Sequence, residues 1–188
     1  MTKTILIPIS KGSEELETIT LVNILRRAEI NVILYSNNDI VYCARGTKLI
    51  PDINSLSNIN IEDISGIILP GGIDGVNNLI ENDELIEFLK EAVSNRKLVG
   101  AICAAPKILD YYNLLPENMK STSHPSIKNI LSKYNYSEKK VVIYENFITS
   151  RGVGTGLDFA FKIVEILLDE SVANKIKTEI VYSWCLNI

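Results

Sequence analysis

The chain has 188 residues, of which 46% are hydrophobic and 22% are charged, and its formal net charge is −4. This length and composition predict one globular domain, residues 1–188, with a sizeable core. The absence of a basic block argues against nucleic acid as the main partner, and the absence of a long apolar run argues against a signal peptide or a membrane span, so we expect a cytoplasmic protein.

Short apolar runs alternate with amphipathic segments along the chain. In the first half of the chain we expect a strand at 4–8, a helix at 14–28, a strand at 31–36, a hairpin across 40–50, a strand at 66–69 and a helix at 83–95. In the second half we expect a strand at 98–102, a helix from 106, a hairpin across 139–151, and helices at 156–168 and 171–180. The single strands are apolar throughout, as parallel strands are when helices cover both faces of their sheet. We therefore predict an α/β fold, a flavodoxin-like, doubly wound sandwich with a mostly parallel central sheet.

The helix expected at 14–28 carries capping signals and an apolar face. Ser13 is the expected N-cap, as Asn82 is for the helix at 83–95. The buried face is predicted to hold apolar residues at helical spacing, namely Leu16, Ile19, Val22 and Leu25 or Ile24. A glutamate beside such a face, here Glu17, is most often solvated and alone indicates no function.

Three segments follow predicted strands at the edge where ligands bind in doubly wound sheets. They are KGSEELE after the first strand, LPGG after the strand at 66–69, and Cys103 after the strand at 98–102. The glycines of LPGG would let backbone N–H groups approach a ligand closely, although Pro-Gly-Gly is also a plain turn. The convergence of these segments predicts a site at this edge.

Cys103 stands where a strand turns sharply into a helix. Ala101 and Ala105 place small residues on both sides, which favours a strand–nucleophile–helix elbow with a positive φ at the cysteine. The amides of a helix N-terminus would lower the pKa of the thiol. The alternative is a structural cysteine that fills a gap in the core.

If Glu17 points at Cys103, the two groups cannot both be charged without cost. Two unit charges ~4 Å apart at an effective dielectric of ~20 repel by about 4 kcal/mol. A helix N-terminus returns only about 0.3–2 kcal/mol. A protonated Glu17 that donates to a Cys103 thiolate is the consistent arrangement, and such a carboxyl is also a general acid.

His124 is the only histidine of the chain. It lies in a polar loop, where a histidine is often only a surface residue, but no other imidazole is available to a cysteine nucleophile. With one histidine and three widely spaced cysteines, Cys43, Cys103 and Cys185, we expect neither a metal site nor a disulfide framework. The tail with Trp184 and Cys185 is assigned no role.

Together these motifs resemble one family. From KGSEELET through LPGG and AICAAP to HP and TSRGVGT, the chain is similar to the Parkinsonism-associated protein deglycase branch (the DJ-one proteins) of the ThiJ/PfpI superfamily. The resemblance covers nearly the whole chain and implies a flavodoxin-like homodimer that needs no cofactor. It implies an enzyme that converts methylglyoxal to D-lactate without glutathione, or that repairs glycated groups.

The resemblance also implies roles for residues of this sequence. Cys103 matches the reactive, readily oxidised nucleophile, Glu17 the protonated glutamate beside it and His124 the active-site histidine. Further matches are Gly71, Gly72 and Ala104, whose backbone amides would surround the thiol, and Arg45, a pocket arginine near the dimer interface. Two departures, Ala105 in place of a usual glycine and Ile73 where a polar residue is common, affect the shape of the pocket.

Other readings are weaker or remain open. The protease-like branch has a histidine directly after the cysteine, where this chain has Ala104. Glutamine amidotransferases pair the cysteine with a His-x-Glu motif, but His124 is followed by Pro125 and Ser126. The open alternative is a redox-sensing or chaperone protein of oxidative-stress defence that uses Cys103 without physiological turnover.

Overall fold

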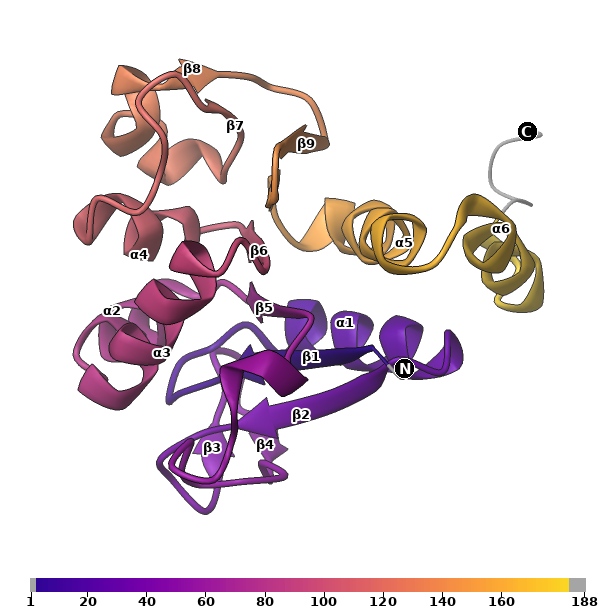
Figure 1. Cartoon of the computed structure of the whole chain (residues 1–188), viewed down its shortest axis with the longest axis horizontal. Coiled ribbons are helices and arrows are strands. Elements are labelled where there is room, and N and C mark those ends of the chain that lie inside the picture. Colours follow the sequence, from indigo (N-terminus) through magenta and orange to yellow (C-terminus); the bar gives the residue numbers. More distant parts are fainter. Residues whose placement is uncertain (1–2, 183–188) are drawn as a thin grey trace.

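The computed structural model of the protein describes residues 3–182, so Trp184 and Cys185 lie outside the described residues. Its centre is a six-stranded sheet in the order β2-β1-β5-β6-β10-β9, in which only the edge strand β9 runs antiparallel (Figure 1). The strands are β1 (Thr4–Pro8), β2 (Asn31–Tyr35), β5 (Gly66–Leu69), β6 (Leu98–Ile102), β9 (Val141–Tyr144) and β10 (Phe147–Ser150). The predicted flavodoxin-like sheet is confirmed.

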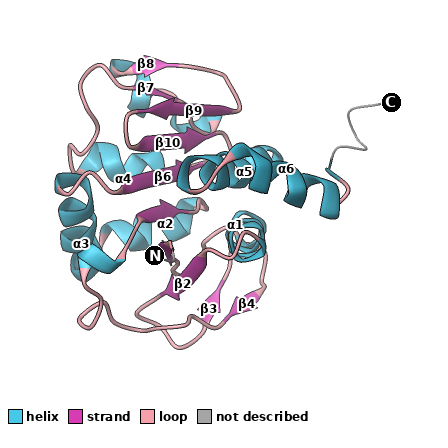
Figure 2. Ribbon diagram, turned by 45° about the vertical axis from the view of Figure 1, so that its right-hand side comes forward, coloured by secondary structure: helices cyan, strands magenta, loops and turns pink. Residues whose placement is uncertain are grey.

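Helices cover both faces of this sheet, as the uniformly apolar strands predict (Figure 2). One layer contains α1 (Glu15–Arg27), α5 (Gly156–Leu167) and α6 (Glu170–Glu179), and the other contains α2 (Ile73–Ile80), α3 (Asp83–Ser94) and α4 (Pro106–Tyr111). Each layer has its own apolar core against the sheet. Asn82 caps α3 as predicted, because its side chain accepts a hydrogen bond from the amide of Leu85.

Shorter elements flank the sheet. The predicted hairpin consists of β3 (Val41–Tyr42) and β4 (Lys48–Leu49), which pair antiparallel. A second small pair, β7 (Lys120–Ser121) and β8 (Asn135–Tyr136), lies outside the central sheet. Sequence reasoning missed this pair and helix α2, which begins directly after the glycines of LPGG.

Helix α1 corrects two predictions. Its N-cap is Glu14, not Ser13, because the Glu14 carboxylate accepts from the amide of Leu16. The predicted apolar face is wrong at its start, since Leu16 is 56% exposed and Ile19 is 44% exposed. The first turns of the helix bury Glu17 instead, which is 1% exposed.

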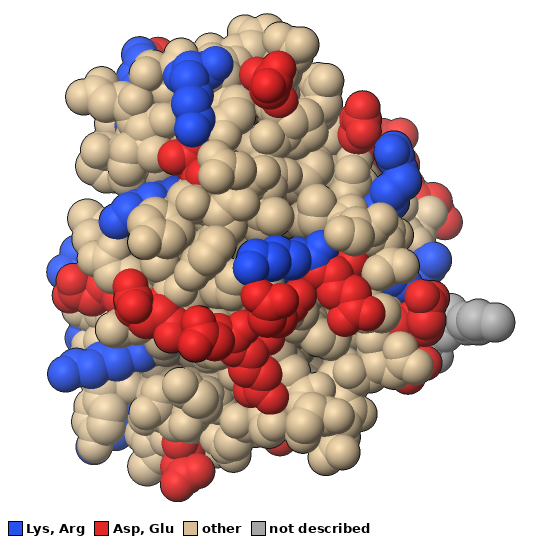
Figure 3. All heavy atoms as spheres, turned by 60° about the vertical axis from the view of Figure 1, so that its left-hand side comes forward, with Lys and Arg blue, Asp and Glu red and all other residues tan. Residues whose placement is uncertain are grey.

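The surface agrees with the charge pattern of the sequence. Acidic side chains form a band across the face shown in Figure 3, where basic side chains lie singly. This face therefore offers no continuous basic surface to a polyanion. Within residues 3–182, no helix is both long and apolar enough to cross a membrane.

Candidate active site

Two neighbouring strands, β5 and β6, end side by side and place the first site residues in contact. The turn after β5 holds Gly71 and Gly72, and the turn after β6 holds Cys103. A Cβ on Gly71 would stand 2.5 Å from the Cβ of Cys103 and 2.7 Å from Oε2 of Glu17. Only glycine fits between these two side chains, so LPGG is more than a plain turn.

The backbone of Cys103 is strained and held in place. Its φ is 63°, in the left-handed region that non-glycine residues rarely adopt, as the elbow prediction required. Its N–H donates to the carbonyl of Ser150 (3.0 Å), and its carbonyl accepts from the N–H of His124 (2.9 Å). Strands β6 and β10 and the His124 loop thus fix the thiol at the carboxyl edge of the sheet.

The carboxyl of Glu17 is buried at the base of the site. Oε2 accepts a hydrogen bond from the N–H of Gly71 at 2.8 Å. Oε1 has no partner of regular hydrogen-bond geometry among the described residues, and the carboxyl group as a whole also interacts with the Cys103 side chain. Burial raises the pKa of Glu17 to about 7, although the Gly71 and Cys103 contacts act in the opposite direction.

While Glu17 is charged, the thiol of Cys103 does not have the lowered pKa that the helix N-terminus alone predicts. Burial, then the charge of Glu17 and the hydrogen bond to it, raise the pKa of Cys103 to about 12, while the amides of Gly72 and Ala104 lower it. The amides thus act in the predicted direction, but beside a charged Glu17 the net shift of the thiol pKa is upward. The main cause is burial of the sulfur, followed by the charge of Glu17 and the hydrogen bond to it, which together outweigh the two backbone amides.

Glu17 and Cys103 therefore titrate as a pair. One proton leaves the pair near pH 7, and the second is held far more tightly because two adjacent anions would repel. In the singly charged pair, the amides of Gly72 and Ala104 favour the charge on sulfur, whereas the amide of Gly71 favours it on the carboxylate. The family resemblance implies that the amide of Gly71 is one of those around the thiol. In the structure this amide instead donates a hydrogen bond to Glu17.

His124 reaches the same point from the loop after β7. Its Nδ1 accepts from the N–H of Ser126 (3.2 Å) and lies 2.8 Å from the Ser126 hydroxyl. Because a backbone N–H can only donate, the neutral imidazole carries its proton on Nε2. This arrangement orients a donor that the sequence alone could not place.

Gly152 marks where the three predicted catalytic side chains meet. A Cβ built on it would lie 3.6 Å from Cδ2 of His124, 3.7 Å from Sγ of Cys103 and 3.8 Å from Oε1 of Glu17. Its φ of 156° also favours glycine. The motif TSRGVGT carries part of the family resemblance, but no local pattern indicates the role of this glycine, whose lack of a side chain leaves space beside the sulfur.

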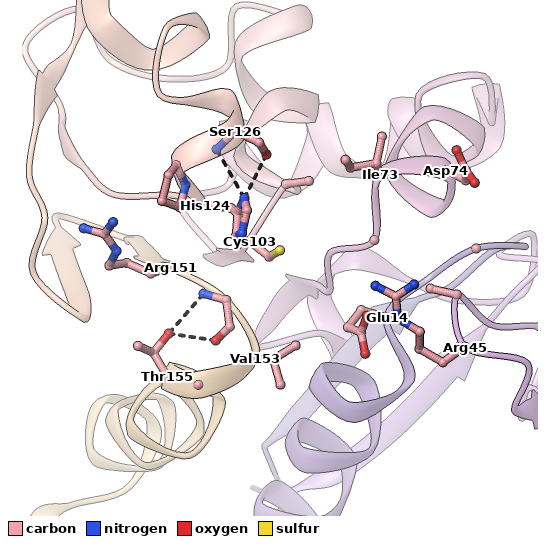
Figure 4. A pocket seen from close by; sticks show the side chains of 17 residues that line it. Glu14, Arg45, Ile73, Asp74, Cys103, His124, Ser126, Arg151, Val153 and Thr155 are labelled. Atoms are coloured by element: carbon pink, nitrogen blue, oxygen red, sulfur yellow. Dashed lines mark hydrogen bonds between the residues drawn. The ribbon is translucent and has the colours of Figure 1, made fainter.

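Above the thiol lies a cleft of about 670 Å³ (Figure 4). Arg45, Gly72 and Ala104 line it as predicted, with Arg45 on the side opposite His124. The backbone N–H of Arg45 is fixed by the Glu15 carboxylate, to which it donates at 3.0 Å. Lining residues that the sequence did not single out for the site are Glu14, Asp74, Ser126, Arg151, Val153 and Thr155.

Comparison with known proteins points in one direction. The chain matches the family model described as DJ-1/PfpI family over residues 3–166. Protein DJ-1 homolog B of Arabidopsis thaliana is 36% identical over 166 residues, and the chain spans 38% of that longer protein's length.

Two animal proteins match over most of their length. Glutathione-independent glyoxalase DJR-1.2 of Caenorhabditis elegans is 36% identical over 166 residues, covering 87% of each chain. The crystal structure of Drosophila melanogaster DJ-1beta superimposes with a TM-score of 0.90 at 35% identity, covering 96% of this chain and 98% of that one. The fold of this chain is thus similar to that of the Drosophila protein over nearly its whole length.

Proposed function

Since the chain belongs to the DJ-1/PfpI family, we propose that it is a glutathione-independent glyoxalase with Cys103 as its nucleophile and methylglyoxal or related aldehydes as its substrates. The observation that carries this proposal is the convergence of a strained cysteine, a buried carboxyl and an oriented imidazole around Gly152. A thiol can add to the aldehyde carbon of such a substrate, and a general acid–base pair beside it can move a proton between the two carbonyl carbons.

In the first step, the Cys103 thiolate adds to the aldehyde carbon of methylglyoxal, and the carbonyl oxygen becomes an alkoxide. The amides of Gly72 and Ala104, which already interact with the sulfur, would stabilise this oxygen. Glu17 holds the proton of the pair while the sulfur attacks. Protonation of the alkoxide, from Glu17 or from Nε2 of His124, completes a hemithioacetal.

In the second step, a proton moves between the two substrate carbons. His124 and Glu17 remove it from the former aldehyde carbon, which gives an enediol, and return a proton to the former ketone carbon. The product is a thioester of lactate on Cys103, which water hydrolyses. Methylglyoxal plus one water gives lactate, because one carbon is oxidised to a carboxylate as its neighbour is reduced to an alcohol, so no cofactor is needed.

The finer parts of the proposal follow from the same chemistry. We propose D-lactate as the product, glycated groups as a further substrate class, and a thiol that oxidises readily because it is partly exposed beside the cleft. A cytoplasmic location also remains a proposal.

The direct test is turnover of methylglyoxal to lactate without glutathione. Cys103→Ser should abolish it, and His124→Ala should lower it by about 10²–10⁴-fold, the usual contribution of a general acid–base. Cys43→Ala is the matched control, because Cys43 is 6% exposed in the core of the α1 layer and should leave the rate unchanged. Full activity in Cys103→Ser, or loss of activity with a chelator, would refute the mechanism.

His124 separates the enzyme from the redox-sensing alternative. Turnover needs the imidazole to move protons, whereas oxidation of the Cys103 thiol needs only the sulfur. If wild-type protein oxidises at Cys103 but forms no lactate, the redox-sensing role replaces the glyoxalase. If His124→Ala stops lactate formation but not oxidation, the glyoxalase stands.

We also propose a homodimer built on helix α1. Leu16 and Ile19 are 56% and 44% exposed on this helix, and Ile50, directly after β4, is 76% exposed. Ile24 and Ile30, by contrast, are each 2% exposed within the subunit, so they are not available to a second copy. An apolar patch on a helix is the surface that a second copy would cover.

A further inference from the structure

We propose that the cleft selects 2-oxoaldehydes with an apolar group of about phenyl size beyond the ketone, and that Ile73 and Val153 are the residues that select them. This inference rests on the glyoxalase proposed above and names the substrate class of the same site.

Ile73 is the first residue of α2 and follows Gly72, whose amide interacts with the Cys103 thiol. It lies outside both apolar cores of the described chain and is 60% exposed, yet it lines the cleft. An isoleucine so exposed contributes little to folding. Its apolar surface is therefore available to a bound molecule.

Val153 repeats this arrangement across the cleft. It follows Gly152, the residue around which Cys103, Glu17 and His124 meet, and it is 42% exposed while lining the same cleft. Figure 4 shows Ile73 and Val153 on different sides of Cys103. Each glycine thus approaches the reacting atoms, and the residue after it presents an apolar side chain at the mouth of the cleft.

The charges of the cleft do not favour an ionic substrate. Two acidic side chains, Glu14 and Asp74, offset two basic ones, Arg45 and Arg151, among the lining residues. The guanidinium of Arg151 donates to the backbone carbonyl of Glu138 at 3.0 Å and points away from Cys103 (Figure 4). A carboxylate or phosphate on the substrate would therefore gain no net attraction here.

A larger apolar group on the substrate would cover apolar surface of the cleft that methylglyoxal leaves exposed to water. The cleft of about 670 Å³ is within the range for ligands much larger than a three-carbon aldehyde. A phenyl ring beside the ketone would remove the exposed parts of Ile73 and Val153 from water, whereas a methyl group is too small to cover both. The same additions and proton transfers at Cys103 would turn phenylglyoxal and one water into mandelate.

The test is the ratio of kcat/KM for phenylglyoxal to kcat/KM for methylglyoxal, measured without glutathione. This ratio does not depend on the fraction of folded enzyme. We expect a ratio above one for wild type, a fall of about 10-fold in both Ile73→Ala and Val153→Ala, and little change in Ile73→Val. Ile166→Ala is the matched control, since Ile166 is 41% exposed on α5, outside the cleft.

The outcomes separate this inference from the proposed function. If wild type converts neither aldehyde, the glyoxalase proposal fails, and the inference fails with it. If wild type converts methylglyoxal but the ratio is below one, or if Ile73→Ala and Val153→Ala leave the ratio at its wild-type value, the glyoxalase stands and the inference is overturned.

Discussion

The two halves of helix α1 bury opposite kinds of side chain. The second half packs Leu21, Ile24 and Leu25 into the core, each no more than 2% exposed. The first half instead buries Glu17 at 1% exposed, and leaves Leu16 at 56% exposed. The same helix thus follows the ordinary rule of apolar burial where it only stabilises the fold, and breaks it at the end that faces the cleft.

The difference shows where stability has been given up for a site. Burying a carboxyl without a full set of partners costs free energy, and the raised pKa of Glu17 expresses that cost. Burying a leucine fully stabilises the fold by about 1.5–3 kcal/mol. Substitutions in the two halves should therefore affect different properties.

The largest expected effect is on turnover, in the first half. Glu17→Gln keeps a hydrogen-bond donor beside the sulfur but cannot transfer a proton, so we expect lactate formation to fall by about 10²–10⁴-fold. The free energy of unfolding at neutral pH should not fall, because an isosteric amide removes a buried titrating group. Turnover and urea unfolding of the same preparation check both statements, and unchanged turnover would remove Glu17 from the mechanism.

A substitution in the second half should lower stability and leave turnover unchanged. Leu21→Ala leaves a cavity in a core where Leu21 is 0% exposed, and we expect it to lower the free energy of unfolding by about 2–5 kcal/mol. The rate per folded molecule should stay near the wild-type value. A large fall in that rate without loss of stability would mean that the two halves are not separate in function.

The next effect concerns pH. Burial raises the pKa of Glu17 from 4.5 to about 7, so between these pH values the folded Glu17–Cys103 pair holds one proton more than the same two groups hold in the unfolded chain. The stability contributed by this group is fully present below the unfolded pKa and is lost as the pH rises through the folded pKa, a change of about 3 kcal/mol. Urea unfolding at about pH 5 and about pH 8 should show this loss in wild type and not in Glu17→Gln. Equal losses in the two proteins would show that Glu17 is charged throughout.

Substitutions on the exposed apolar face of α1 are expected to have the smallest effect on the fold of the subunit. Leu16→Glu together with Ile19→Glu should convert the proposed dimer to a monomer in sedimentation experiments at micromolar concentration. The pair replaces side chains that are already exposed, so the fold itself should remain. Ile166→Glu, on the exposed side of α5, should leave the dimer intact. A monomeric wild type would contradict the proposal.

The strands of the central sheet could be predicted from the sequence because they are buried on both faces. The runs TILIP, GIIL and LVGAI are apolar on both faces and bounded by turn residues, and they became β1, β5 and β6 with the expected parallel pairing. Cys103 was found for a related reason, since small residues on both sides of a cysteine between strand and helix require a sharp turn.

The missed features depend on contacts between segments far apart in the chain. Whether Glu17 or Leu16 faces inward is decided by the amide of Gly71 and by Cys103, which no local pattern contains. The place of Gly152 likewise follows only when three distant side chains meet. Helix α2 was missed because the eight residues after Gly72 include a glycine and two adjacent asparagines, which weaken its helical pattern.

The central claim is that Glu17 keeps the proton of the pair while Cys103 carries the charge. The rate of alkylation of Cys103 as a function of pH, followed by mass spectrometry of the modified peptide, tests it directly. We predict that reactivity rises near pH 7 in wild type and at a similar pH in Glu17→Gln, but at a clearly higher pH in Glu17→Asp, whose shorter side chain cannot reach the sulfur. A wild-type thiol that stays unreactive up to the region of pH 12 would show that Glu17 ionises first, and identical profiles for Glu17→Gln and Glu17→Asp would show that no donor acts on the sulfur.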